Sequence, residues 1–226
     1  MSGVEIRVVA DAAEAAQLVA ERLAEQARAG GHVVLTGGST PRRAYEAAAE
    51  LESDWSRVDL WWGDERCVPP DDERSNYGMA KEALLDRITA QPVVHRMRGE
   101  LGRDAGAAAY ARELTGVGTF DLVLLGLGPD GHVASLFPDF PTLDVTDRDV
   151  VGSEAGHEPF VDRITLTLRR LAATRELLFL VTGEDKADAV ARALSGEPSR
   201  ETPGSLARAA EGATQAIVDR AAAAKL

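Results

Sequence analysis

The stretch DLVLLGLGPDGHVASLFPD, from Asp121 to Asp139, decides the fold of this chain. Its apolar run, Leu122 to Leu125, predicts a buried strand, because a short apolar segment bounded by turn residues is typical of a sheet core. The strand ends in a turn that holds three glycines and one proline within six residues. The same turn carries Asp130 and His132. The stretch therefore predicts a strand whose carboxyl end presents a carboxylate and an imidazole.

The rest of the chain alternates strands with helices. Apolar or alternating segments predict strands at 4–10, 32–38, 57–65, 120–128, 163–168, 176–183 and 215–219. Capping residues and Ala-rich segments predict helices at 11–28, from Ser39 onward, at 75–88, at 103–114, at 185–194 and after Asp219. This order predicts an α/β fold with a mostly parallel sheet and helices on both faces. No composition shift divides the chain, so we expect a single domain over 1–226, with the polar segment 137–162, which contains His157, as a loop over the sheet.

The composition narrows the class of protein. The 226 residues carry a formal net charge of −12, which has the wrong sign for a nucleic-acid binder, and one cysteine allows no internal disulfide. No apolar run is long enough to cross a bilayer, and the first residues lack the features of a signal peptide. We therefore expect a cytoplasmic, enzyme-like protein that binds neither nucleic acid nor membrane. We also expect a monomer, with an oligomer left open as the alternative. An anionic ligand would need a site made locally positive against this acidic background.

Four predicted strands end in polar turns that contain glycine. In open α/β sheets, ligands bind outside the carboxyl ends of the strands. If the sheet is parallel, all four turns lie at one edge, and this coincidence predicts a single active site. The turns are Thr36–Thr40, Gly63–Arg66, Gly126–His132 and Thr182–Lys186.

Two of these turns offer groups that suit a phosphate. In LTGGSTPRRAY, the pair Gly37 and Gly38 lets the backbone approach a ligand closely. Ser39 and Thr40 then add hydroxyls at a helix start, where free N–H groups and the helix dipole favour anions. Lys186 lies in the first turn after another strand, within reach of an anion at the same edge. The alternatives are an ordinary capped turn and a solvated lysine.

The segment WWGDER contributes further charges. The guanidinium of Arg66 can bind phosphate or carboxylate through two parallel hydrogen bonds. Asp64 precedes it, and Arg163, which opens RITLTL, is a similar cationic candidate. The alternative for such a run is a solvated surface. Cys67 has no partner histidine marked in the sequence, so we do not expect a nucleophilic cysteine.

His132 is the candidate general base. Imidazole titrates near neutral pH, so a ring presented on a glycine turn can take a proton from water. Asp130 either orients this ring or contacts a substrate hydroxyl. The turn also fits the G-x-G-x-x-G template of dinucleotide sites, but Pro129 suits a tight turn better and the required acidic strand end does not follow. No His and Cys cluster has the spacing of metal ligands.

Four segments, taken together, carry a family resemblance. LTGGSTPRRAYE, WWGDERCVPPDDERSNYGMA, DLVLLGLGPDGHVASLFP and RITLTLRRLAATRELLFLVTGEDKADAV resemble, in order and spacing, the glucosamine-6-phosphate isomerase/6-phosphogluconolactonase family. The resemblance extends from Val4 to Asp219. It implies a Rossmann-like three-layer α/β/α fold shared with sugar-phosphate isomerases and deaminases. It also implies hydrolysis of 6-phospho-D-glucono-1,5-lactone in the oxidative pentose phosphate pathway, with no metal or organic cofactor.

The resemblance also implies roles for individual residues. His132 would act as general base on the water that attacks the lactone carbonyl, and Asp130 would support the ring or the substrate. Arg66 and Lys186 would hold the phosphate. The Gly37–Thr40 turn would line the sugar-phosphate pocket. Arg163 falls in a matching segment without a defined role.

Two rival functions remain at this stage. The first is an aldose–ketose isomerase or a deaminase acting on a sugar phosphate, which needs a base beside a carbonyl. Deaminases that resemble this chain carry that base as an Asp followed by Glu and Tyr; here Asp64 and Glu65 are followed by Arg66, which favours the lactonase. The second rival is a non-catalytic sugar-phosphate-binding domain, for which we expect a DNA-binding partner domain that this chain has no room to hold.

Overall fold

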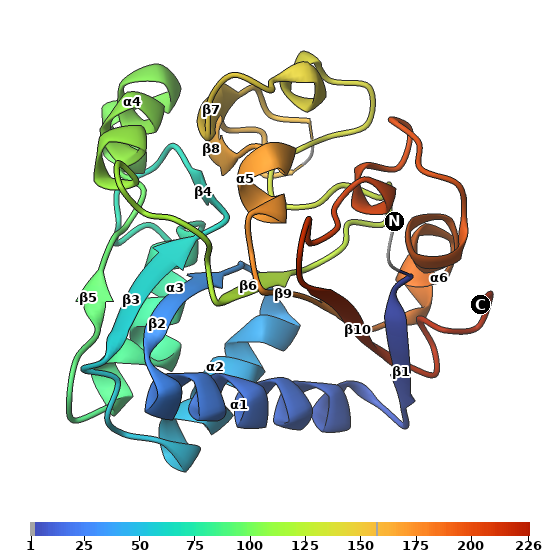
Figure 1. The fold of residues 1–226 in the computed structure, drawn as a ribbon, viewed down its shortest axis with the longest axis horizontal. Helices are drawn as coiled ribbons and strands as arrows, with labels where there is room; N and C mark the ends of the chain where they lie inside the picture. Colours follow the sequence, from blue (N-terminus) through green and yellow to red (C-terminus); the bar gives the residue numbers. More distant parts are fainter. Residues whose placement is uncertain (1–2, 157) are drawn as a thin grey trace.

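The computed structural model describes residues 3–156 and 158–226, and its centre is a seven-stranded sheet (Figure 1). His157, which the sequence places in the polar loop, lies outside these residues. Every strand pairing in this sheet is parallel, so the predicted α/β fold with a mostly parallel sheet is confirmed. In spatial order the strands are β1 (Glu5–Val9), β10 (Ala213–Asp219), β9 (Glu176–Val181), β6 (Leu122–Leu125), β2 (Gly31–Leu35), β3 (Val58–Trp62) and β5 (Val93–Val94).

The two faces of the sheet are covered by different elements. Successive side chains of a strand point to opposite faces, so Leu122 and Leu124 of β6 join the core under α1, α2 and α3, while Val123 and Leu125 join the core on the other face. Figure 1 shows α1 and α2 on one side of the sheet, with α4, α5 and a small second sheet on the other. The α-helices are α1 (Ala12–Ala29), α2 (Ser39–Leu51), α3 (Asn76–Ala83), α4 (Arg103–Glu113), α5 (Leu168–Ala172) and α6 (Ala187–Val190).

The second sheet corrects two predictions from the sequence. RITLTL forms a strand, but that strand pairs antiparallel on both sides, and the predicted loop 137–162 contributes one of its partners. The predicted strand 57–65 also divides at Gly63, whose carbonyl accepts the N–H of Leu166. Pairing across about a hundred residues leaves no local signal, so the alternating pattern could not give its direction. The strands are β4 (Asp64–Arg66), β8 (Arg163–Leu166) and β7 (Val150–Ser153).

Two helix predictions near the C-terminus also change. The Ala-rich segment after Asp219 forms turns, and the Asp219 carboxylate accepts the N–H groups of both Ala222 and Gly183. The predicted helix 185–194 contains only four α-helical residues, flanked by other turns. Alanine propensity is a weak prior that such local contacts override. The short turns are the 3₁₀ segments η1 (Leu85–Arg87), η2 (Gly99–Leu101), η3 (Pro141–Asp144), η4 (Glu184–Lys186) and η6 (Pro203–Ser205), and the π segment η5 (Ala191–Ser195).

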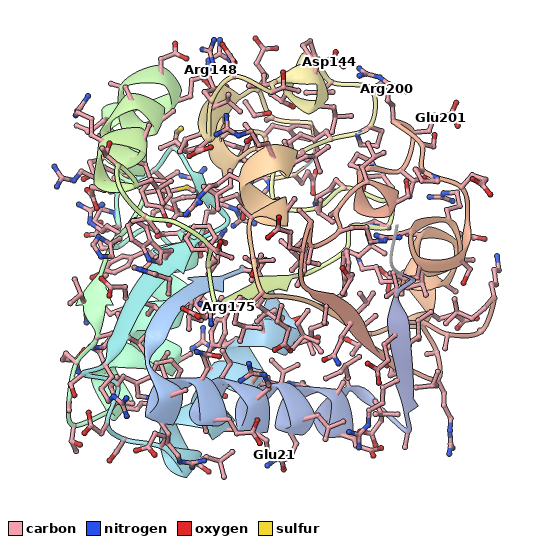
Figure 2. The ribbon with its side chains drawn as sticks, viewed as in Figure 1. Glu21, Asp144, Arg148, Arg175, Arg200 and Glu201 are labelled. Atoms are coloured by element: carbon pink, nitrogen blue, oxygen red, sulfur yellow. The ribbon has the colours of Figure 1, made fainter. Side chains whose placement is uncertain are left out.

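Charged side chains cover the outer surface of the molecule (Figure 2). Among those labelled, Asp144 and Arg200 form an ion pair that joins η3 to the turn before η6. Arg175, which precedes β9, lies within 3.5 Å of the Asp121 carboxylate. Within the described ranges, no helix is both long enough and apolar enough to cross a membrane.

Candidate active site

The strands β2, β3, β6 and β9 are parallel, so the turns that follow them meet at one edge of the sheet. A cavity of about 280 Å³ opens there. All four predicted turns contribute residues to its wall: the catalytic candidate His132 comes from the turn after β6, and the cation Lys186 from η4. The sequence-predicted residues on its wall are Gly37, Gly38, Asp64, Arg66, His132 and Lys186.

A second recess of about 390 Å³ adjoins the first and shares Lys186 and the Gly37–Gly38 turn with it. Ser39 and Thr40 line this recess and not the cavity that holds His132. The Thr40 hydroxyl lies 2.8 Å from the hydroxyl of Thr182, which ties the start of α2 to the end of β9. The structure thus divides the predicted site residues between two connected spaces.

His132 and Asp130 form a close pair in the turn that follows the carboxyl end of β6. Asp130 Oδ1 lies 2.6 Å from His132 Nδ1 and also accepts the His132 backbone N–H at 3.1 Å. A carboxylate at Nδ1 fixes the ring orientation and leaves proton exchange to Nε2. Of the two roles left open for Asp130, the geometry favours orientation of the imidazole.

Glycine is required at two positions of this turn for different reasons. A Cβ on Gly128 would overlap the His132 ring and approach the Asp130 carboxylate, so only glycine leaves room for the pair. Gly131 has a φ of +95°, a conformation that other residues adopt only with strain. Two backbone bonds close the turn, from Gly128 N to the His132 carbonyl and from Gly131 N to the Gly128 carbonyl, each 2.9 Å long. The glycine turn at the end of the strand therefore leaves room for the imidazole and fixes its position.

Asp64 is buried at the cavity wall, and both of its carboxylate oxygens accept hydrogen bonds. Ser135 donates its hydroxyl to Oδ2 at 2.6 Å, and Asn76 donates its side-chain amide to Oδ1 at 3.1 Å. Sequence reasoning missed Ser135 and Asn76. Both lie inside segments that carry the family resemblance, but only the fold brings either residue to Asp64.

Glu65, next to Asp64, binds the N-terminus of α3 through hydrogen bonds. Its buried carboxylate accepts the Ser75 hydroxyl and the backbone N–H groups of Asn76 and Tyr77, at 2.7–2.9 Å. Burial raises the pKa of the Glu65 carboxyl and outweighs these hydrogen bonds, which lower it. Glu65 therefore fixes the helix that carries Asn76.

Two cations line the cavity. Arg66 donates from Nη1 to the Arg74 carbonyl at 2.5 Å, while its buried Nε finds no acceptor among the described residues. The guanidinium is thus held in place with donor capacity left over. Lys186 lines both spaces, and its ammonium lies 3.4 Å from the Asp185 carboxylate, longer than a close ion pair.

Arg163 differs from its predicted placement as a ligand-binding cation. It is 3% exposed and does not occur among the described residues that line either space. Its guanidinium donates to the carbonyls of Val161 and Pro159, at 3.0 and 2.8 Å. Burial lowers the pKa of this guanidinium, and so does the positive charge of Arg66. Arg163 therefore braces the segment beside Glu158, which does line the cavity.

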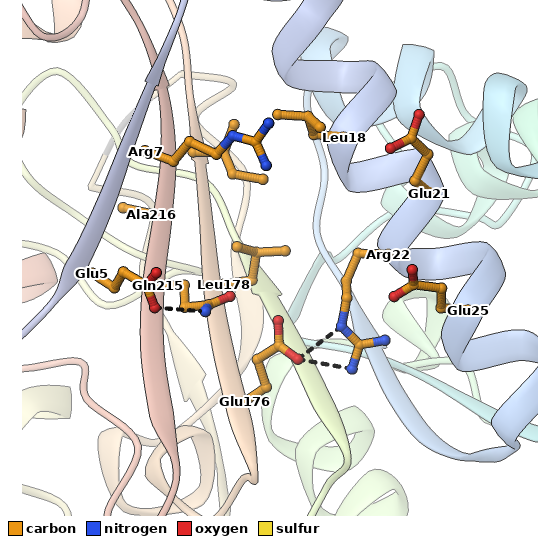
Figure 3. Close-up of a pocket in the computed structure, with 11 residues that line it drawn as sticks. Glu5, Arg7, Leu18, Glu21, Arg22, Glu25, Glu176, Leu178, Gln215 and Ala216 are labelled. Carbon is orange, nitrogen blue, oxygen red and sulfur yellow. Dashed lines mark hydrogen bonds and ion pairs between the residues drawn. The ribbon is translucent and has the colours of Figure 1, made fainter.

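A separate cavity of about 260 Å³ lies between α1 and strands β1, β10 and β9 (Figure 3). Two interactions cross its wall: Arg22 pairs with Glu176 at 2.8 Å, and the neutral Gln215 side chain donates to Glu5 at 2.9 Å. Glu5 and Glu176 are the first residues of their strands, so this cavity lies toward the amino ends of the sheet. It holds no histidine and no glycine turn, so we assign the candidate active site to the His132 cavity.

Among the described residues, no group of three or more His, Cys, Asp or Glu side chains is arranged to hold a metal ion. The two remaining histidines of the described ranges pack against Trp61. His95 stacks on its ring at a centroid distance of 3.8 Å, and His32 accepts its indole N–H at 3.2 Å. Both rings therefore have packing roles, which leaves His132 as the imidazole at the carboxyl edge among the described residues.

Comparisons with known proteins point to one family. Residues 7–216 match the family model described as glucosamine-6-phosphate isomerases/6-phosphogluconolactonase. A 6-phosphogluconolactonase from Streptomyces coelicolor is 44% identical over 95% of this chain and 89% of its own length. The crystal structure of a 6-phosphogluconolactonase from Thermotoga maritima is 32% identical, covers 96% of this chain and all of that one, and has a TM-score of 0.85. A monomeric glucosamine-6-phosphate deaminase, at 19% identity and a TM-score of 0.88, shares the fold.

Proposed function

The chain belongs to the family of glucosamine-6-phosphate isomerases and 6-phosphogluconolactonases, and from this premise we propose that His132 acts as its general base. The protein is an enzyme that hydrolyses 6-phospho-D-glucono-1,5-lactone to 6-phosphogluconate, a step of the pentose phosphate pathway. The observation that carries the mechanism is the His132–Asp130 pair, 2.6 Å apart, on the wall of a cavity that also holds Arg66 and Lys186.

The proposed reaction follows from the fixed ring. Asp130 holds Nδ1, so Nε2 takes a proton from a water molecule as its oxygen attacks the lactone carbonyl carbon. A tetrahedral oxyanion forms and then collapses, and the bond from the carbonyl carbon to the ring oxygen breaks. The protonated His132 returns its proton to that oxygen, which becomes a hydroxyl. The acid that forms ionises at neutral pH, so each turnover releases one proton.

The two connected spaces suggest how the substrate lies. We assign the phosphate to the recess at the start of α2, where Gly38 has no side-chain capping bond and Lys186 stands opposite. A helix N-terminus without a side-chain cap offers N–H donors to an anion. The lactone ring then extends into the cavity of His132. Arg66 lines only that cavity, so we place its guanidinium at the negative charge that develops on the lactone carbonyl, and not at the phosphate.

The contacts of Asp64 argue against the isomerase and deaminase alternative. Those reactions need a carboxylate that is available to remove a proton from carbon. Both Asp64 oxygens already accept hydrogen bonds, from Ser135 and Asn76. These two donors hold the Asp64 carboxylate in place and stabilise its charged form, which makes it a weaker base, so we assign the role of base to the paired imidazole. The same pair and the residual donor capacity of Arg66 favour catalysis over binding alone.

Further proposals concern the protein as a whole. We propose that it acts as a monomer, because the turns of a single chain are enough to assemble the cavity with His132, Arg66 and Lys186. A cytoplasmic location fits a chain with one cysteine and a sugar-phosphate substrate. A net charge of −12 supports the absence of nucleic acid among its partners.

Proton release tests the proposed function directly. The lactone is generated in place from glucose 6-phosphate, and hydrolysis is followed in a pH-stat with the wild type and His132→Asn. We expect the variant to lose about 10²- to 10⁴-fold in kcat, which is the usual contribution of a general base. The matched control is His32→Asn, which changes a histidine near the amino end of β2 and should keep wild-type kcat.

Two outcomes would contradict the proposal. Equal kcat for the wild type and His132→Asn would remove His132 from the role of base. No acceleration by the wild type over buffer, together with turnover of glucosamine 6-phosphate, would replace the lactonase by the deaminase alternative.

A further inference from the structure

We propose that Asn76 determines substrate specificity, because its side-chain Oδ1 accepts a hydrogen bond from one hydroxyl of the lactone ring. The inference rests on the proposed function and adds to it a contact that selects among lactones.

Asn76 is fixed in place before any substrate binds. It is the first residue of α3, it is 3% exposed, and it lines the His132 cavity. Its backbone N–H donates to Glu65 Oε1 at 2.7 Å, at the N-terminus that the Glu65 carboxylate caps. The side chain therefore has little freedom to move away from the cavity.

The orientation of the amide is set by Asp64. Asn76 Nδ2 donates to the Asp64 carbonyl at 3.0 Å and to Asp64 Oδ1 at 3.1 Å. An amide nitrogen has two hydrogens, so both are used. A flipped amide would bring its oxygen against two acceptors and lose both bonds. The oxygen Oδ1 therefore points away from β4.

Oδ1 is an acceptor with open capacity on the cavity side. No described residue donates a hydrogen bond to it, yet it is not among the buried atoms that lack a partner, so solvent reaches it. It lies against Gly37, where a Cβ would collide with it. Gly37 lines both spaces of the site. The missing side chain at Gly37 thus keeps Oδ1 accessible from the space that the substrate occupies.

Because Asn76 Oδ1 is an amide oxygen, its partner on the substrate must be a hydrogen-bond donor. It accepts from O–H or N–H donors and offers nothing to a phosphate or a carbonyl, which are acceptors. The donors of this substrate are the ring hydroxyls at C2, C3 and C4. A site built to accept from a hydroxyl discriminates strongly against the analogue that lacks it, because the acceptor is then left without a partner. Asn76 should therefore favour lactones that carry one particular hydroxyl.

A substrate series with matched variants tests this contact. The full chain, as wild type, Asn76→Ala and Ser135→Ala, is assayed on the parent lactone and on its 2-, 3- and 4-deoxy analogues. Ser135→Ala is the control, because it also removes one hydrogen bond from Asp64 but changes a residue that does not line the cavity among those described. We expect Asn76→Ala to lose about 5- to 100-fold in kcat/KM on the parent lactone, as for a buried acceptor contact.

The decisive readout is how that loss depends on the substrate. For one deoxy analogue, the ratio of wild-type to Asn76→Ala kcat/KM should fall to near one, while for Ser135→Ala the ratio stays the same on every lactone. A constant ratio for Asn76→Ala across the series would show that Asn76 acts only through Asp64, and it would overturn the inference. If the wild type fails to hydrolyse even the parent lactone, the proposed function fails instead.

A structural measurement covers the case in which Asn76→Ala does not fold. In a crystal structure of the wild type with 6-phosphogluconate, Asn76 Oδ1 should lie within hydrogen-bond distance of one hydroxyl. An Oδ1 beyond that distance from every hydroxyl would overturn the inference.

Discussion

Gly128 supports the His132 ring, and its missing side chain has a specific consequence. A Cβ at this position would overlap the imidazole, but its backbone φ lies outside the range that favours glycine. Gly128→Ala should therefore displace the ring without straining the backbone. We expect a loss of about 10²-fold or more in kcat, because the proton transfer depends on ring placement, and a Tm close to that of the wild type. Gly118→Ala, at an open position with an unstrained backbone, is the control. A Gly128→Ala enzyme with full kcat would show that the imidazole position is not critical.

Lys186 and Arg66 should separate in their kinetic effects, because both line the His132 cavity but only Lys186 also lines the recess assigned to the phosphate. Lys186 reaches the recess assigned to the phosphate, whereas Arg66 lines only the His132 cavity. Lys186→Ala should raise KM for the phosphorylated lactone about 10-fold or more with little change in kcat, since a remote anchor acts on ground and transition states alike. Arg66→Ala should lower kcat by about 10²-fold, as for a lost oxyanion donor.

The readout for both variants is steady-state kinetics on 6-phosphogluconolactone and on unphosphorylated gluconolactone. Lys186→Ala should leave the activity on gluconolactone unchanged. The reverse pattern, with KM raised by Arg66→Ala and kcat lowered by Lys186→Ala, would exchange the two assignments.

The start of α3 is capped by the Glu65 carboxylate, and burial disfavours the charged form of this group. Burial raises the pKa of Glu65 above its ordinary value of 4.5 in the folded protein. The folded state then binds this proton more tightly than the unfolded state, so the group stabilises folding most below pH 4.5 and loses that contribution as pH rises through the folded pKa. Glu65→Gln cannot titrate. The Tm of the wild type minus that of Glu65→Gln should therefore fall as pH rises from 4.5.

The size of this effect has an upper bound. One titrating proton changes the free energy of unfolding by at most about 1.4 kcal/mol per pH unit, or about 3–5 °C in Tm for a chain of this length. Thermal melts of both proteins over a pH series measure it, and the subtraction removes the titration of all other groups. A difference that grows with pH would mean that the hydrogen bonds to Glu65 outweigh its burial.

Elements with local signals were predictable from the sequence, and those that depend on distant pairing were not. β2, β6 and β9 are apolar runs that end at glycine turns, and the structure has them within a few residues of the predicted bounds. β7 is a separate case: its partner β8 lies only 10–16 residues away, but the polar, glycine- and proline-bearing sequence around it predicts a loop. The same division holds in the site. The His132 turn is one continuous motif; Ser135 lies only three residues after His132, but its contact with Asp64 spans 71 residues and has no local signal.

At the scale of the whole molecule, an acidic protein must bind an anionic substrate. The chain carries a net charge of −12, Asp64 and Glu158 line the site, and Asp130 lies against His132. The attraction for the phosphate must therefore be short-range, from Lys186 and the start of α2. Such contacts work only if the turns from distant strands hold their positions together, so binding and global stability should be coupled.

That coupling gives a test of the proposal that 1–226 is a single domain. One hydrophobic core contains Val123 and Phe179 of the main sheet together with Ile164 and Leu166 of the small sheet. β1 pairs with β10, which joins the two ends of the chain in one sheet. We therefore expect a single unfolding transition in calorimetry, with equal calorimetric and van't Hoff enthalpies.

The product 6-phosphogluconate should shift this whole transition upward, because it binds only the folded state. At 100 times its Kd the stabilisation is about 2.7 kcal/mol, which corresponds to a rise in Tm of about 5–10 °C for a chain of this length. Gluconate, which lacks the phosphate, should produce a much smaller shift, and Lys186→Ala should weaken the response to the product. Two transitions, of which the product moves only one, would mean that the small sheet or the terminal strands unfold separately and that the chain is not one cooperative unit.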